Sequence, residues 1–137
     1  MQAGTPELTR LAEAVFRAAG ALVAEFEQAA GQIALTKQQA TVLRAIPATG
    51  AMAELAAACR IDPSNLTGVI TRLEERGYAV RRPSAADRRT KVIDLTAAGR
   101  RALATFERQL SRTTTLATRL DAREREVLID LLDRLGG

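Results

Sequence analysis

The chain has 137 residues, of which 47% are hydrophobic and 26% are charged, and its formal net charge is +4. This composition is typical of one folded domain and excludes a disordered segment. One Cys and no His exclude an internal disulfide, disfavour a zinc, copper or haem site, and remove the commonest general base. No apolar stretch approaches the roughly 20 residues of a membrane span, and Met1 to Thr9 lack a signal-peptide layout. We therefore expect a soluble cytoplasmic protein, without a metal or cofactor, that is not an enzyme.

The positive charge is concentrated in one segment. Residues 76–91 contain one acidic residue, Asp87. The same segment contains six basic residues, which are Arg76, Arg81, Arg82, Arg88, Arg89 and Lys91. Its net charge is therefore +5, and the rest of the chain carries −1 of the total of +4. A charged run is most often a solvated loop, so its meaning depends on the elements around it.

Helical periodicity begins near the N-terminus. Apolar residues at spacings of three and four predict an amphipathic helix over residues 6–29, interrupted at Gly31. Its apolar stripe consists of Leu8, Leu11, Val15, Ala18, Leu22 and Phe26. A second helix is predicted to begin after Thr36, because Thr36 and Gln39 have the spacing of a capping box, and to end at Pro47.

Two further short helices follow closely. The third helix is predicted from an apolar stripe that includes Cys59, for which a core role is favoured over a redox role. The other members of this stripe are Met52, Leu55 and Ala56. The fourth helix is predicted to begin with Asp62 as its N-cap and Pro63 at its first position, and to end at Gly77 as a C-terminal cap.

The fourth helix has two different faces. Its core stripe is expected to contain Leu66, Val69, Ile70 and Leu73. The opposite face carries mostly small, hydrogen-bonding residues, which are Ser64, Asn65, Thr67, Gly68, Thr71, Arg72 and Glu75. An ordinary solvated helix would carry Lys and Glu at several of these positions. Small polar side chains instead allow the backbone of a helix to approach a groove closely.

After the fourth helix the period of the pattern changes to two. Residues 78–82 and 91–95 predict a β-hairpin with a long basic loop. Thr96 is the expected cap of a fifth helix, whose stripe contains Leu103, Phe106, Leu110, Thr113 and Ala117. A sixth helix is predicted to begin at Asp121, with Glu124 completing a capping pattern. Its apolar stripe contains Leu128, Leu131, Leu132 and Leu135.

This order of elements predicts a mainly α fold with about six helices and a winged helix-turn-helix. A short helix, a turn of about three residues and a helix with a polar face form a helix-turn-helix, whose second helix can lie in the major groove of DNA. The hairpin that follows adds a wing, and the basic segment falls on that wing. Charge and shape therefore indicate the same partner, double-stranded DNA.

Several motifs together resemble the MarR family of bacterial transcription regulators. They are Leu35-Thr36-Lys37-Gln38-Gln39-Ala40-Thr41-Val42-Leu43, Glu54-Leu55-Ala56, Asp62-Pro63-Ser64-Asn65-Leu66-Thr67, Arg72-Leu73-Glu74-Glu75-Arg76-Gly77-Tyr78, Asp87-Arg88-Arg89 and Leu95-Thr96-Ala97-Ala98-Gly99. The resemblance covers nearly the whole chain. The wing motif followed by Leu-Thr-x-x-Gly is fairly specific, whereas many winged-helix families share the helix-turn-helix pattern. The resemblance implies one domain over residues 1–137, with a DNA-binding lobe at 34–96 and dimerisation helices at 5–30 and 97–137.

The resemblance also implies roles for individual residues. The recognition surface would comprise Ser64, Asn65, Thr67, Gly68, Thr71 and Arg72. Arg72 is the one member able to contact guanine in a bidentate manner, and a phosphate contact is an equal alternative. In the wing, Asp87 would hold Arg89 in the minor groove, although both residues also suit a purely structural role in the turn. Phosphate contacts are expected from Arg82, Arg88, Lys91, Thr36 and Lys37.

Family resemblance further implies a homodimer on a pseudo-palindromic operator. The apolar stripes available for dimerisation are Leu8, Leu11, Val15, Leu22, Leu128, Leu131, Leu132 and Leu135. A small organic effector is implied as well, and the apolar residues that could contact it are Phe16, Phe26, Met52 and Phe106. Core packing is the competing role for each of these four. The position of Cys59 outside the first helix disfavours a thiol-sensing regulator.

These observations lead to a repressor that occludes a promoter and is released by a small molecule, acting in the cytoplasm on the nucleoid. The alternative is a winged-helix module that docks its basic wing on an acidic protein without binding specific DNA. The small polar face of the fourth helix favours the DNA-binding alternative.

Overall fold

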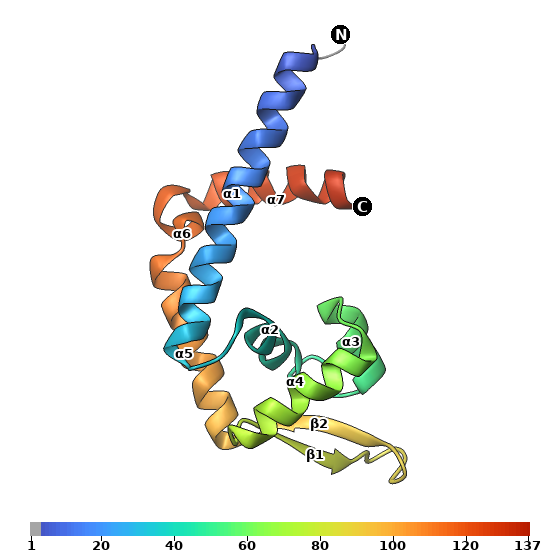
Figure 1. The fold of residues 1–137 in the computed structure, drawn as a ribbon. Coiled ribbons are helices and arrows are strands. Elements are labelled where there is room, and N and C mark those ends of the chain that lie inside the picture. The colour runs from blue at the N-terminus through green and yellow to red at the C-terminus, as the bar shows by residue number, and fades with distance from the viewer. Residues whose placement is uncertain (1–3) are drawn as a thin grey trace. The chain divides into compact units, whose positions relative to one another are not determined.

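The computed structural model describes residues 4–137, and this part of the chain is mainly helical, as predicted (Figure 1). Its helices are α1 (Thr5–Gln32), α2 (Lys37–Ala45), α3 (Met52–Cys59), α4 (Pro63–Glu75), α5 (Ala97–Thr113), α6 (Thr115–Arg119) and α7 (Ala122–Gly136). Strands β1 (Ala79–Pro83) and β2 (Lys91–Leu95) form one antiparallel sheet. The chain divides into two compact units. One comprises Ala29–Glu107, and the other comprises the chain up to Gln28 together with the chain from Arg108 onward.

Two helix boundaries differ from the prediction. The first helix is not interrupted at Gly31 but continues to Gln32, because an isolated glycine weakens a helix without ending it. The fifth helix stops at Thr113 instead of running on to Ala117. Thr114 adopts an extended conformation with ψ 134° and accepts a hydrogen bond from the amide of Leu116, so a separate short helix, α6, begins there.

The core of the unit Ala29–Glu107 is built from the predicted apolar stripes. The side chains that α2, α3 and α4 bury most completely are Val42, Leu43, Leu55, Leu66, Ile70 and Leu73. Strand β2 adds Ile93 and Leu95, and α5 adds Phe106. Met52 and Cys59 are half-buried, so they border this core without filling it. At the start of α2, Thr36 and Gln39 form the predicted capping box.

The two ends of α4 are defined in different ways. Asp62 is the N-cap residue, as predicted, with φ −56° and ψ 136°, but its carboxylate makes no capping hydrogen bond. The restricted φ of Pro63 at the first position therefore sets the start of the helix. At the other end Gly77 has a φ of +73°, and the amides of Gly77 and Tyr78 donate to the carbonyls of Glu74 and Leu73. This is the Schellman arrangement that the glycine predicts.

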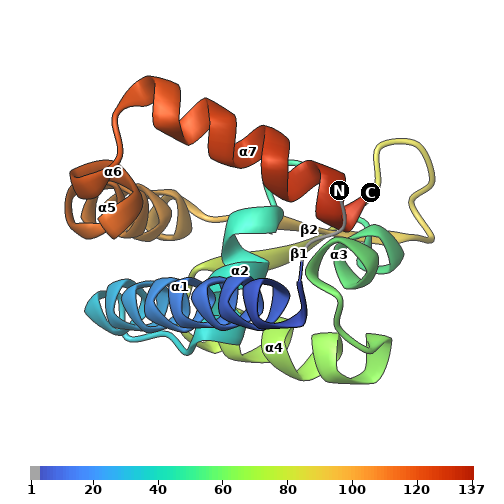
Figure 2. The same ribbon diagram turned by 90° about the horizontal axis from the view of Figure 1, so that it is seen from above.

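The hairpin packs beside α4, and the loop between its strands projects beyond the neighbouring helices (Figures 1 and 2). Its register pairs Ala79 with Leu95 and Pro83 with Lys91, so β1 begins one residue later than predicted. The segment before α3 joins the hairpin, because the amide of Ile93 donates a hydrogen bond of 2.8 Å to the carbonyl of Gly50. Helices α3 and α4 and this hairpin form a winged helix-turn-helix.

In the other unit, Glu25 of α1 holds the break between α5 and α6. Its carboxylate accepts hydrogen bonds from the hydroxyls of Thr114 and Thr115, at 3.0 and 2.6 Å, and from the amide of Thr115 at 3.1 Å. The bond from the Thr115 hydroxyl is the main reason that the pKa of Glu25 lies below its ordinary value of 4.5. A carboxylate that is bonded in this way satisfies the exposed amide at the start of α6.

Replacing Glu25 by Gln should flatten the acid limb of the stability profile. Because the pKa of Glu25 is lowered on folding, its contribution is fully present above the unfolded pKa and is lost as the pH falls through the lower folded pKa. We expect wild-type protein to lose more unfolding free energy than Glu25→Gln between neutral pH and about pH 3. Denaturant titrations across this range measure the difference. Parallel curves for the two proteins would contradict the assigned role.

Candidate nucleic-acid interface

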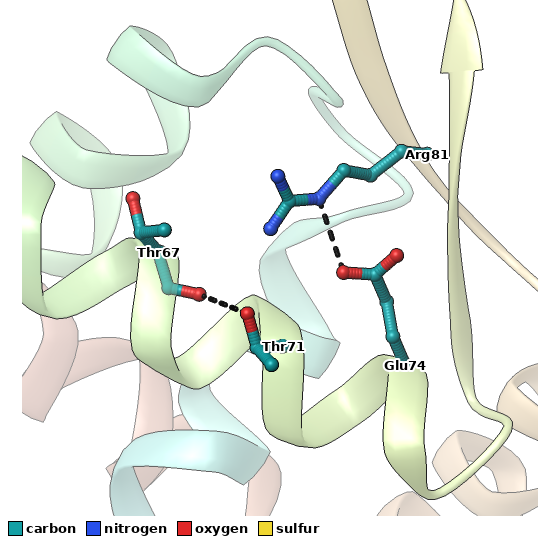
Figure 3. Close-up of polar contacts among 4 residues, drawn as sticks. All are labelled: Thr67, Thr71, Glu74 and Arg81. Carbon is teal, nitrogen blue, oxygen red and sulfur yellow. Dashed lines mark hydrogen bonds and ion pairs between the residues drawn. The ribbon is translucent and has the colours of Figure 1, made fainter.

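One face of α4 is exposed along its whole length and is almost free of large side chains. Its members are the residues predicted for this surface, Ser64, Asn65, Thr67, Gly68, Thr71 and Arg72, and all of them are exposed. The Thr67 hydroxyl donates to the carbonyl of Pro63 at 3.2 Å. The Thr71 hydroxyl donates to the carbonyl of Thr67 at 3.0 Å, as Figure 3 shows. Each hydroxyl oxygen remains able to accept a hydrogen bond from outside. The face therefore offers short polar side chains that can donate or accept hydrogen bonds close to the helix backbone.

A groove of about 450 Å³ runs along one side of this face, between α4 and the start of α2. It is lined by Thr36, Gln38, Gln39, Asn65, Gly68, Val69 and Arg72. The oxygen of Thr36 accepts from the amide of Gln39 at 3.2 Å, which leaves the hydroxyl proton free to donate. Gln38 was missed by the sequence argument, although its place in the first turn of α2, beside Lys37, could have suggested it. Lys37 is exposed in the same turn.

The opposite side of the face adjoins the wing. Thr67, Thr71 and Glu74 form one row along α4, because they are spaced by four and three residues. Arg81 of β1 reaches this row, where its Nε lies 3.0 Å from Oε1 of Glu74 (Figure 3). Sequence reasoning missed both Glu74 and Arg81, since Glu74 was assigned to neither face and Arg81 was counted only as one charge of the basic segment.

Asp87 organises the backbone at the tip of the wing. Its Oδ1 accepts from the amide of Arg89 at 3.0 Å, and its backbone carbonyl accepts from the amide of Thr90 at 3.0 Å. Within residues 4–137 neither Asp87 nor the Arg89 guanidinium takes part in an ion pair. The expected carboxylate–guanidinium contact is therefore absent from this structure, and Asp87 holds the turn that presents Arg89.

The cations of the wing fall into two groups. Arg81 is paired with Glu74, and Nε of Arg82 lies 3.6 Å from Oδ2 of Asp94. In the part of the chain that the structure describes, Arg88, Arg89 and Lys91 have no such partner, and all three are exposed. The unpaired charge is thus gathered at the tip of the hairpin, where it is available to an anionic partner.

The residues predicted for an effector pocket are divided between the two units. Phe106 is completely buried in the core of the unit Ala29–Glu107, Met52 is half-buried there, and Phe16 is 76% exposed in the other unit. Phe26 is half-buried in that second unit. Burial raises the pKa of the Cys59 thiol, which disfavours the reactive thiolate.

The apolar stripes predicted for dimerisation are largely open to solvent. Leu8, Leu11 and Val15 of α1 are exposed, and Leu22 is half-buried. In α7 the exposed members are Leu131, Leu132 and Leu135, with Leu135 at 74%, and Leu128 is half-buried. Soluble monomers rarely leave so many large apolar side chains uncovered.

Within residues 4–137, no group of three or more His, Cys, Asp or Glu residues could hold a metal ion. None of the helices in this range has the length and apolar character that crossing a bilayer requires.

The sequence matches a family model described as the MarR family over residues 35–90. A curated relative, a putative transcriptional regulatory protein for the hcr operon of Thauera aromatica, is 40% identical over 82 residues. The matched segment covers 59% of this chain and 49% of that protein, so the chain spans about half the length of this relative.

Solved structures extend the similarity to the whole fold. The transcriptional repressor CouR, known from Rhodococcus jostii RHA1, was solved with a 23-mer DNA duplex and is 27% identical, with a TM-score of 0.80 and 100% coverage of both chains. BpsR of Bordetella bronchiseptica, whose DNA binding is regulated by 6-hydroxynicotinic acid, is 28% identical, with a TM-score of 0.72 and coverage of 93% of this chain and 99% of its own.

Proposed function

We propose that the chain is a member of the MarR family and a sequence-specific DNA-binding transcription regulator that acts as a homodimeric repressor. The observation that carries this proposal lies within one compact unit. There, the exposed polar face of α4 adjoins a hairpin whose tip carries the unpaired cations Arg88, Arg89 and Lys91. We assign residues 34–96 to DNA binding and residues 5–30 and 97–137 to dimerisation. The protein would act in the cytoplasm, on the nucleoid, and we assign it no catalytic activity.

In this proposal α4 enters the major groove and the wing contacts the adjacent minor groove. Arg72 is the residue of α4 that can recognise guanine or clamp a phosphate. Arg89, presented by the turn that Asp87 holds, enters the minor groove, and Arg88 and Lys91 neutralise phosphates beside it. Arg82 would reach phosphate only after giving up its contact with Asp94, so its contribution is the smaller. Thr36 and Lys37 would bind the backbone from the first turn of α2.

The proposed dimer is supported by the uncovered leucines of α1 and α7. A second copy of the chain would cover them and would place two recognition helices on the two halves of a pseudo-palindromic site. Sedimentation equilibrium should therefore give twice the chain mass of 14.7 kDa at micromolar concentration. A monomeric mass under these conditions would contradict this part of the proposal.

We further propose that a small organic ligand releases the repressor. The support comes from relatives, since the structure of BpsR concerns regulation of its DNA binding by 6-hydroxynicotinic acid and CouR was solved with p-coumaroyl-CoA. Phe16 is the most accessible of the predicted contact residues, Phe26 and Met52 are half-buried, and Phe106 is fully buried. A ligand acts in this way only if it binds the DNA-free form more tightly than the DNA-bound form.

The proposed function is tested by DNA binding as a function of salt. If a dimer places Lys37, Arg88, Arg89 and Lys91 of both subunits on phosphates or in the minor groove, about eight cations are engaged, and the slope of log K against log salt should be about −7. A gel-shift or fluorescence-anisotropy titration of mixed duplex fragments measures this slope. Failure to retain any duplex at low salt would reject DNA binding and favour an acidic protein partner.

Replacing Gly68 by Ala should separate stability from binding. A Cβ at Gly68 would meet no atom within 4 Å, so packing does not require the glycine. The substitution should stabilise α4 by about 0.5–1 kcal/mol, because alanine is the better helix former. It should weaken operator binding about tenfold, comparable to one mismatched base pair, because the new methyl group stands on the surface that meets DNA. Thermal melts and anisotropy titrations check the two effects, and unchanged affinity would remove Gly68 from the interface.

A further inference from the structure

The wing-side edge of the recognition surface carries a charge pair. Thr67, Thr71 and Glu74 lie in one row on α4, and Glu74 is the member nearest the hairpin end of the helix. Arg81 is on the face of the hairpin that also carries the buried residues Ile93 and Leu95, as the alternation along the strands requires. This face packs toward α4. Arg81 is therefore the arginine of the hairpin stem that points to the recognition helix.

The pairing leaves part of Arg81 free. Only Nε of Arg81 is bonded to Glu74, at 3.0 Å, and within residues 4–137 its two terminal nitrogens have no hydrogen-bond partner. Figure 3 shows these nitrogens directed away from Glu74, toward the side of α4 that carries Thr67 and Thr71. The side chains of Arg81 and Glu74 are 39% and 33% exposed, so both are partly buried. Two nitrogens with four N–H donors are thus held at the edge of the surface that is proposed to meet DNA.

The pairing also changes how Arg81 interacts with a polyanion. A cation that is already neutralised by a neighbouring carboxylate releases few counterions when it approaches phosphate, so it adds little to salt-dependent binding of any duplex. Arg88 is the contrasting case, because it has no ion-pair partner in the described chain. Arg82 differs as well, since its contact with Asp94 is longer, at 3.6 Å, and lies on the other face of the hairpin.

We propose that Glu74 is a positioning residue for operator specificity, which holds the terminal nitrogens of Arg81 beside the recognition helix and cancels its charge. Arg81 then donates hydrogen bonds to the DNA strand that passes α4 on its wing side, and it can do so only when α4 is fully seated in a matching major groove. It contributes to operator binding and not to the binding of unrelated DNA. This inference rests on the proposed function and adds a specificity role for two residues outside the predicted interface.

The experiment compares an operator duplex, selected from a random pool with the wild-type protein, and an unrelated duplex of equal length across a salt series. The double variant Arg81→Gln/Glu74→Gln removes the pair at constant net charge, so it should weaken operator binding about tenfold and leave both the binding of the unrelated duplex and the salt slope unchanged. Arg88→Gln serves as the reference. It should weaken binding to both duplexes by the same factor and reduce the magnitude of the salt slope by about 0.9 for each arginine engaged. Glu74→Gln should raise affinity for the unrelated duplex, steepen the slope and lower the operator preference.

Glu75→Gln is the matched control for Glu74→Gln, because Glu75 is the neighbouring acid on α4 and has no ion-pair partner in the described chain. It removes the same charge and should change the affinities for both duplexes by the same factor, so the preference for the operator stays intact. The inference is overturned if the double variant lowers the affinity for both duplexes and the slope as Arg88→Gln does, or if it changes the affinity for neither duplex. It is also overturned if Glu74→Gln and Glu75→Gln alter the preference equally. Absence of wild-type binding to either duplex would overturn the proposed function itself, so the two failures are distinguishable.

Discussion

Replacing Gly99 by Ala is expected to destabilise the protein by about 3 kcal/mol or more, since the backbone leaves no room for a side chain. A Cβ at Gly99 would lie 2.0 Å from the carbonyl oxygen of Tyr78. That backbone cannot retreat easily, because the amide of Thr96 donates to the same carbonyl at 3.1 Å. The Thr96 hydroxyl adds a bond to the carbonyl of Gly77 at 2.5 Å and accepts from the amide of Gly99 at 3.0 Å.

Denaturant titration measures this loss as a change in the free energy of unfolding. The matched control is Gly20→Ala, because a Cβ at Gly20 in α1 meets nothing within 4 Å. That variant should gain about 0.5–1 kcal/mol, the ordinary preference of a helix for alanine over glycine. Wild-type stability in Gly99→Ala would mean that α5 does not approach the start of the wing as closely as described.

Replacing Arg89 by Ala should weaken operator binding by about ten- to a hundredfold, which corresponds to the loss of one good specific contact. Arg89 is exposed at the tip of the hairpin, and its amide is held by Asp87 at 3.0 Å. Because the guanidinium has no partner within the described chain, its removal should leave the free energy of unfolding unchanged. Anisotropy titration at fixed salt measures the loss of affinity.

Arg17→Ala is the control for this substitution. It removes an exposed arginine from α1, outside the unit that holds the wing, and should change the affinity by less than about twofold. Sedimentation should give the same mass for both variants and for wild type. Equal affinities of Arg89→Ala and wild type would remove the proposed minor-groove contact and reassign the tip to a structural role.

The parts of the fold that the sequence predicted are those set by local chemistry. Helical and strand periodicity located the elements, Thr36 and Gln39 marked the start of α2, and Gly77 marked the end of α4. These signals act within a few residues of the chain, so a single sequence contains all of the information. The exposed polar face of α4 was predictable for the same reason.

The parts that could not be predicted depend on residues brought together by the fold. The carboxylate of Glu25 meets Thr114 and Thr115, about ninety positions away, and nothing in the local pattern of α5 announces the break there. The pairing of Arg81 with Glu74 depends on how the hairpin packs on α4. Asp87 had two possible partners, and the tight turn determined that it holds the backbone amide of Arg89. Charge counting alone therefore overestimated the cations available to DNA.

Selection of bound fragments from a random DNA pool, followed by sequencing, tests the central claim most directly. A homodimer that inserts two α4 helices into successive major grooves should enrich an inverted repeat whose half-sites are about 10–10.5 base pairs apart, centre to centre. The enriched duplex should bind with a stoichiometry of two chains. Recovery of fragments with no shared sequence, or of none at all, would contradict the assignment of this chain as a dimeric sequence-specific regulator.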